Sequence, residues 1–67
     1  MIAVTVNGKP REVEDETDLA GLLRSLEVDG RGVAVARNAE IVPRETYATV
    51  TLREGDSIEI VRMVGGG

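Results

Sequence analysis

The sequence of 67 residues ends in three consecutive glycines, and the reactive group that they offer is the α-carboxylate of Gly67. A terminal carboxyl group has a pKa of about 3.3–3.7, so it is ionised at neutral pH. Because Gly65, Gly66 and Gly67 lack Cβ atoms, they can enter a narrow channel and lie close to the backbone of another protein. At about 3.3–3.6 Å per residue, they reach roughly 10 Å beyond a folded body. This tail is therefore a candidate site for chemistry at a main-chain carboxylate.

A carboxylate resists nucleophilic attack until one of its oxygens becomes a good leaving group. Transfer of an adenylyl group from ATP would achieve this, and a sulfur nucleophile could then attack the unhindered carbonyl of Gly67. A terminal glycine run also has a purely structural interpretation, because chain ends are often disordered. Two features favour function instead: the glycines directly follow a strong strand pattern and end the polypeptide, and no residue after Arg62 is charged.

The side chains that most often carry chemistry are scarce. The sequence has no cysteine, histidine, tryptophan or phenylalanine, which excludes thiol nucleophiles, imidazole acid–base catalysis and soft-ligand metal sites. Tyr47 is the single aromatic residue, and we expect its ring to pack, because no partner base accompanies it. The acidic residues between positions 12 and 18 lack the spacing and turn glycine of a calcium loop, so we interpret them as a solvated surface.

Length and composition predict a single small domain. The formal net charge of −4 disfavours nucleic acid as a partner, since phosphate binding needs clustered Lys and Arg. No apolar run approaches the roughly 20 residues of a membrane-spanning helix, and residues 1–8 lack the pattern of a signal peptide. We therefore expect a cytoplasmic protein without membrane or nucleic-acid contacts. A core this small also leaves little room for a ligand pocket, so we expect no metal site and no tightly bound cofactor.

The first part of the chain predicts a β-hairpin. Residues 2–6 alternate between Ile or Val and smaller residues, which indicates a half-buried strand. Asn7 and Gly8 follow, and this dipeptide suits the positive φ angles of a tight hairpin turn. Pro10 limits pairing next to the turn, so we expect the second strand, more polar and edge-like, at residues 11–14.

A helix and three more strands follow. Thr17 is the expected N-cap, with Asp18 in the first turn, and an apolar stripe at helical spacing is formed by Leu19, Leu22, Leu23 and Leu26. Residues 32–37, 40–42 and 57–60 read as strands, with turns at 38–39 and 53–56, while residues 46–51 are ambiguous. The order, two strands, a helix and three strands, predicts an α+β fold with the helix on one face of the sheet. We place the domain at residues 1–64 and a flexible glycine tail at 65–67.

These features resemble the ThiS family of thiamine-biosynthesis sulfur carriers over essentially the whole chain. The most specific similarities are the Ile41-Val42-Pro43-Arg44 segment and the stretch from Gly55 through Val64 to the glycines. Asn38-Ala39 stands where many members have Asn-Gly. The resemblance implies a ubiquitin-like β-grasp fold with a mixed sheet of four to five strands and one main helix.

The resemblance also implies a function. In this family the C-terminal glycine is adenylated by a ThiF-type enzyme that uses ATP and Mg, and sulfur from a cysteine desulfurase or another donor converts it to a thiocarboxylate. Thiazole synthase, ThiG, then receives the sulfur for the thiazole ring of thiamine. Carried over, Gly67 bears the adenylate and the thiocarboxylate, and Gly65 and Gly66 form an access arm. The chain would be a protein co-substrate and not itself an enzyme.

Three other functions are compatible with the sequence. One is a sulfur carrier like the small subunit of molybdopterin synthase, which the Val-Pro-Arg segment disfavours. Another is a modifier attached to lysines of target proteins, and a third is a non-covalent β-grasp interaction module. We expect partner docking around Met63 and Val64, since an interface must extend beyond three glycines to reach a standard contact area. Arg44 is a further docking candidate, because arginine is enriched in interfaces.

Overall fold

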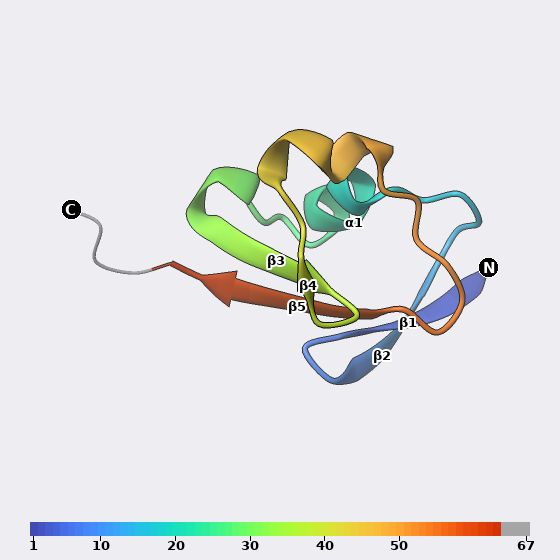
Figure 1. The fold of residues 1–67 in the computed structure, drawn as a ribbon. Coiled ribbons are helices and arrows are strands. Elements are labelled where there is room, and N and C mark those ends of the chain that lie inside the picture. The colour runs from blue at the N-terminus through green and yellow to red at the C-terminus, as the bar shows by residue number, and fades with distance from the viewer. Residues whose placement is uncertain (64–67) are drawn as a thin grey trace.

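The computed structural model describes residues 1–63, which form a five-stranded mixed sheet in the order β2-β1-β5-β3-β4. The hairpin β1 (Ile2–Val6) and β2 (Lys9–Val13) precedes α1 (Leu19–Ser25) and a short 3₁₀ segment, η1 (Gly30–Gly32). A second hairpin follows, formed by β3 (Val33–Arg37) and β4 (Glu40–Ile41). A longer 3₁₀ segment, η2 (Arg44–Thr49), then leads to the last strand, β5 (Ser57–Arg62). Figure 1 shows α1 and both 3₁₀ segments on one side of the sheet. The predicted α+β architecture is confirmed.

The strand β5 lies at the centre of the sheet, although it is last in the sequence. It pairs parallel with β1 and antiparallel with β3. In Figure 1 it runs from beneath the helical layer to the end of the molecule opposite the N-terminus. The first residues of β5 therefore have a neighbouring strand on each side.

The first hairpin forms at Asn7 and Gly8, whose φ angles are 52° and 81°. The expected effect of Pro10 on pairing is wrong, because β2 begins at Lys9 and Pro10 lies opposite Thr5. With a turn of two residues, the bonded pair is Val6 and Lys9, so the nitrogen of Pro10 faces away from β1. Pro10 therefore removes no ladder hydrogen bond, and it sits on an edge strand where proline is tolerated.

The helix α1 spans seven residues and begins one position later than predicted. Its N-cap is Asp18, whose Oδ1 accepts a hydrogen bond from the Gly21 N–H at 2.7 Å. Thr17, the expected cap, instead donates its hydroxyl proton to the Glu14 carbonyl. Within residues 1–63, no helix is long and apolar enough to cross a membrane.

The core lies between α1 and the inner face of the sheet. Leu19, Leu22 and Leu23 of the predicted leucine stripe are buried, whereas Leu26, the C-cap of the helix, is only partly buried. The buried side chains of the sheet and the following loops that meet the stripe are Val4, Val13, Val33, Val35, Tyr47, Leu52 and Ile58. Tyr47 packs against Gly30, where an added Cβ would approach the ring to 3.3 Å. The packing role expected for its ring is confirmed.

The second hairpin turns at Asn38 and Ala39, as predicted, with φ angles of 52° and 73°. The ambiguous stretch after Pro43 is the 3₁₀ segment η2, in which Tyr47 is the buried residue. A tight turn then leads into β5, and Gly55 adopts a φ of 87° in it. Asn38 in the hairpin turn and Asp56 after the tight turn both lie at the start of β5, where their side chains are hydrogen-bonded to each other.

Candidate functional site at the end of β5

Backbone hydrogen bonds hold β5 on both sides. Toward β1, the Thr5 N–H donates to the Asp56 carbonyl at 2.9 Å and the Asn7 N–H donates to the Ile58 carbonyl at 2.8 Å. Toward β3, the Asn38 N–H donates to the Ser57 carbonyl at 2.8 Å. The last described residue is also held, because the Met63 N–H donates to the Gly32 carbonyl at 3.0 Å. The body therefore holds the chain as far as Met63, two residues before the predicted glycine tail.

Two hairpin asparagines extend these ladders with their side chains. The Oδ1 of Asn7 accepts a hydrogen bond from the Ile60 N–H at 2.8 Å, beyond the point where β1 ends. The Oδ1 of Asn38 accepts from the Ser57 N–H at 2.9 Å. Both residues have positive φ angles, which asparagine tolerates better than most residues. Each turn thus positions an amide oxygen against β5.

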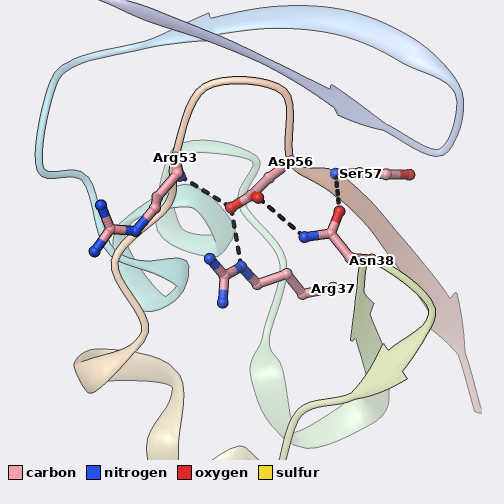
Figure 2. Close-up of polar contacts among 5 residues, drawn as sticks. All are labelled: Arg37, Asn38, Arg53, Asp56 and Ser57. Atoms are coloured by element: carbon pink, nitrogen blue, oxygen red, sulfur yellow. Dashed lines mark hydrogen bonds and ion pairs between the residues drawn. The ribbon is translucent and has the colours of Figure 1, made fainter.

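Asp56 connects the start of β5 to the β3–β4 hairpin, as Figure 2 shows. Its carboxylate is buried and accepts three hydrogen bonds, from the Arg53 N–H, the Arg37 Nε–H and the Asn38 amide, at 2.9, 2.9 and 3.0 Å. Burial by itself raises the pKa of Asp56, but the bonds from Arg53, Asn38 and Arg37 together outweigh it and hold the pKa below its usual value. Asp56 is therefore a charged carboxylate with hydrogen-bond donors on both oxygens, and it joins the turn before β5 to the β3–β4 hairpin.

The predicted site residues divide between two parts of the chain. Val64, Gly65, Gly66 and Gly67 lie outside the described residues, so the tail and the 1–64 and 65–67 boundaries remain predictions. Met63 lies at the end of the described chain with 62% of its surface exposed. It thus occupies the position next to the tail that docking would require.

Two exposed apolar residues accompany Met63 on the outer face of the sheet. Val61 lies opposite Ala34 and Ile41 lies opposite Ala36, and side chains alternate between faces along a strand. Since Val35 and Ile58 point into the core, Val61 and Ile41 point away from it, and they are 59% and 73% exposed. We call Ile41, Val61 and Met63 the outer apolar patch. Sequence reasoning missed Ile41 and Val61, although continuing the alternation from Ile58 and Ile60 would have placed Val61 on the outer face.

Arg44 does not share a face with the outer apolar patch. It is the exposed first residue of η2, which lies beside α1 on the opposite side of the sheet (Figure 1). Pro43 precedes it as the N-cap. Met63 and Arg44, which were both predicted to dock partners, therefore lie on opposite sides of the sheet.

The acidic residues near the start of α1 line a shallow groove of about 490 Å³ with Arg11 and Ser25. Glu12, Glu14 and Glu16 are exposed to solvent, and Asp18 is the helix cap. In residues 1–63, no group of three or more Asp, Glu, His or Cys side chains is arranged to hold a metal ion. Asp18 thus has a structural role as the helix cap, and its acidic neighbours are surface residues.

Comparison with known proteins gives a consistent set of relatives. The model of the ThiS family matches residues 4–67. The sulfur carrier protein ThiS of Bacillus subtilis is 41% identical over 63 residues, which are 92% of this chain and 96% of that protein. A thiazole synthase of Paramagnetospirillum magneticum is 45% identical over 64 residues, 96% of this chain. The chain spans only 20% of the length of that synthase.

A solved structure supports the fold. The crystal structure of a thiamine biosynthesis protein (ThiS) from Geobacter metallireducens superimposes with a TM-score of 0.86 at 35% sequence identity. The match covers 98% of this chain and 100% of that one. Together with the five-stranded sheet and the single main helix, it confirms the β-grasp fold that the family resemblance implies.

Proposed function

Because the chain belongs to the ThiS family, we propose that it is a sulfur carrier of thiamine biosynthesis that carries sulfur as a thiocarboxylate at Gly67. The observation that carries this proposal is the family match, which extends through Gly67. The absence of cysteine from the sequence supports it, since sulfur must then be held on a main-chain group. The proposal requires a free carboxylate at Gly67 in the native protein.

The chemistry proceeds in two steps at this carboxylate. One carboxylate oxygen attacks the α-phosphorus of ATP and pyrophosphate leaves, which converts the oxygen into part of a good leaving group. Hydrosulfide then attacks the carbonyl carbon and AMP leaves, which gives the thiocarboxylate. A persulfide donor would instead form an acyl disulfide, which a thiol must reduce to release the thiocarboxylate. Glycine suits both steps because no Cβ hinders the approach to its carbonyl.

Partner enzymes supply the catalysis in this proposal, and the chain supplies the tail. A ThiF-type adenylyltransferase with ATP and Mg would activate Gly67, a cysteine desulfurase or another donor would provide sulfur, and thiazole synthase ThiG would accept it. Relatives named thiazole synthase that contain a segment similar to this chain support the last partner. We assign the carrier to the cytoplasm, where ATP is available.

Intact-mass spectrometry tests the proposal. After incubation with ATP, Mg, the ThiF-type enzyme and sulfide as the sulfur donor, we expect a mass gain equal to the replacement of one oxygen by sulfur, located at Gly67. A variant that lacks Gly66 and Gly67 is the control, and it should fold normally but gain no sulfur. An unchanged mass of the full chain under these conditions would refute the assignment.

We further propose that the outer apolar patch and Val64 dock the activating enzyme, with Arg44 as a separate contact on the helical side. Exposed apolar groups next to a reactive tail are suited to partner binding. Substitution Met63→Glu should slow adenylation at least about tenfold, because it places a charge in an apolar interface. Thr49→Glu, at an exposed position on η2, is the matched control and should have little effect. Normal adenylation of the Met63→Glu variant would exclude the patch.

A further inference from the structure

One side of β5 has no strand neighbour along its second half. β1 pairs with β5 only at Ser57 and Ile58, whereas β3 pairs with β5 as far as Arg62. β1 stops there because the chain turns at Asn7 and Gly8. Within residues 1–63, β5 therefore presents an open edge from Ile60 to Arg62.

The hydrogen-bond pattern shows which groups face this edge. Ser57 and Met63 bond toward β3, while Ile58 and Ile60 bond toward β1 and Asn7. Backbone groups alternate along a strand, so the N–H and C=O of Arg62 and the C=O of Ile60 also face the side of β1. The Ile60 N–H already donates a hydrogen bond to the side chain of Asn7. The Ile60 C=O and the backbone groups of Arg62 can pair with another strand.

A groove of about 230 Å³ lies beside this open edge. Apolar side chains and polar groups both line it, and Arg62 supplies a positive charge; the other lining residues are Val6, Asn7, Leu26, Val28, Val33 and Ile60. The three ion pairs found within residues 1–63 involve Asp15, Asp29 and Asp56, and none uses Arg62. The groove therefore offers several apolar side chains, backbone groups of the open edge and a cation to the same ligand.

We propose that an extended segment of thiazole synthase adds to β5 as an extra strand at Ile60–Arg62. Strand addition to an open edge provides main-chain hydrogen bonds, and adjacent pockets select side chains. The segment would place an apolar side chain in the groove and an acidic one near Arg62. This inference rests on the proposed function, because the choice of partner depends on it.

Two observations favour thiazole synthase as the occupant. A thiazole synthase contains, within its own polypeptide, a segment of 64 residues that is 45% identical to this chain, so the two kinds of domain are used together. In addition, β5 leads directly into residues 64–67, so a strand paired at Arg62 would set the direction in which the tail leaves. A partner that accepts sulfur from Gly67 needs such a fixed direction, since small misplacements of reacting atoms slow a reaction strongly.

Amide hydrogen exchange tests the strand pairing. In the isotopically labelled chain, saturating thiazole synthase should slow exchange of the Arg62 amide at least about tenfold, because it gains a hydrogen-bond acceptor. The Met63 amide, already bonded to Gly32, is the internal reference. Binding of the synthase without protection at Arg62 would overturn the inference and leave the proposed function intact. Failure of the synthase to bind at all would overturn both.

Synthetic variants separate the backbone contact from the side-chain contact. N-methylation of Arg62 removes the edge N–H and should weaken binding of the synthase at least about tenfold. N-methylation of Glu12, whose N–H faces outward from the edge strand β2 by the pairing of Ala3 with Glu12, should leave binding unchanged. Arg62→Glu should also weaken binding, whereas Arg24→Glu on α1, with the same charge change, should not. Equal affinity of the N-methyl-Arg62 chain and the unmodified chain would refute the added strand.

Discussion

Among single residues, Ala39 is held in a backbone conformation that favours glycine. Its φ of 73° lies in the left-handed region, which costs a residue with a Cβ about 1–2 kcal/mol. Ala39→Gly should therefore raise the free energy of unfolding by about 0.5–1 kcal/mol after the greater freedom of glycine in the unfolded chain is subtracted. Urea unfolding measures this change. Ala36→Gly within β3 is the control and should lower stability, and a lowered stability of both variants would contradict the explanation.

Asp56 is the one charged residue that is buried within residues 1–63, so its charge state bears directly on folding. Its pKa is lowered because the hydrogen bonds from Arg53, Asn38 and Arg37 outweigh the effect of burial. A group with a lowered folded-state pKa stabilises the protein above its unfolded pKa, about 3.9 for Asp, and this contribution is lost as the pH falls through the folded value. Asp56→Asn should lower the free energy of unfolding by about 1–3 kcal/mol at pH 7.

Unfolding by urea at pH 7 and at several values below pH 4 checks this prediction. The difference in stability between the native chain and the Asp56→Asn variant should shrink as the pH falls, because the native carboxylate becomes protonated. Glu59→Gln on β5, an exposed position, removes the same charge and controls for the change in net charge. A difference that stays constant from pH 7 to about pH 2 would show that the charge of Asp56 is not what stabilises the turn.

The elements were predictable where one periodicity dominates. The alternation in residues 2–6 and 57–60 and the leucine spacing in residues 19–26 gave β1, β5 and α1, because each has one buried face. The cap was misplaced by one residue because Thr17 and Asp18 are both good caps and tertiary contacts decide between them. No periodicity marks η2, and no local pattern places β5 between β1 and β3. The resemblance implied the β-grasp fold, and the assembled sheet shows the strand order. The outer apolar patch depends on which face the helix covers, which only the assembled sheet shows.

Asn7 links two elements, since its side chain continues the β1 ladder toward Ile60. Asn7→Gly keeps a residue suited to positive φ but removes the acceptor, so the Ile60 amide should exchange faster and stability should fall by about 1 kcal/mol. Asn7→Asp retains an acceptor and should restore most of the protection. Native-state hydrogen exchange resolves the Ile60 amide. Unchanged exchange in the Asn7→Gly variant would show that the side-chain bond does not hold this part of β5.

In the proposed function, the molecule as a whole divides its tasks between a folded body and a tail. Its size limits its stability, since about 0.05–0.15 kcal/mol per residue amounts to roughly 3–10 kcal/mol for a chain of this length. The core depends on few side chains, and Leu19, Leu22 and Ile58 are fully buried. The buried core residues of the described chain lie between Val4 and Ile58, whereas the reactive carboxylate is proposed at Gly67. Stability and sulfur loading should therefore be separable.

The substitution Leu22→Ala tests this separation. Leu22 is fully buried, so its truncation should lower the free energy of unfolding by about 2–5 kcal/mol and the Tm by roughly 10–30 °C. Leu26→Ala, at the partly buried helix C-cap, should cost less. Well below the lowered Tm, where the Leu22→Ala variant is still folded, sulfur loading at Gly67 should proceed at the native rate, as followed by intact mass. A slower rate of sulfur loading in the folded variant would show that the packing around Leu22 affects the reaction at Gly67.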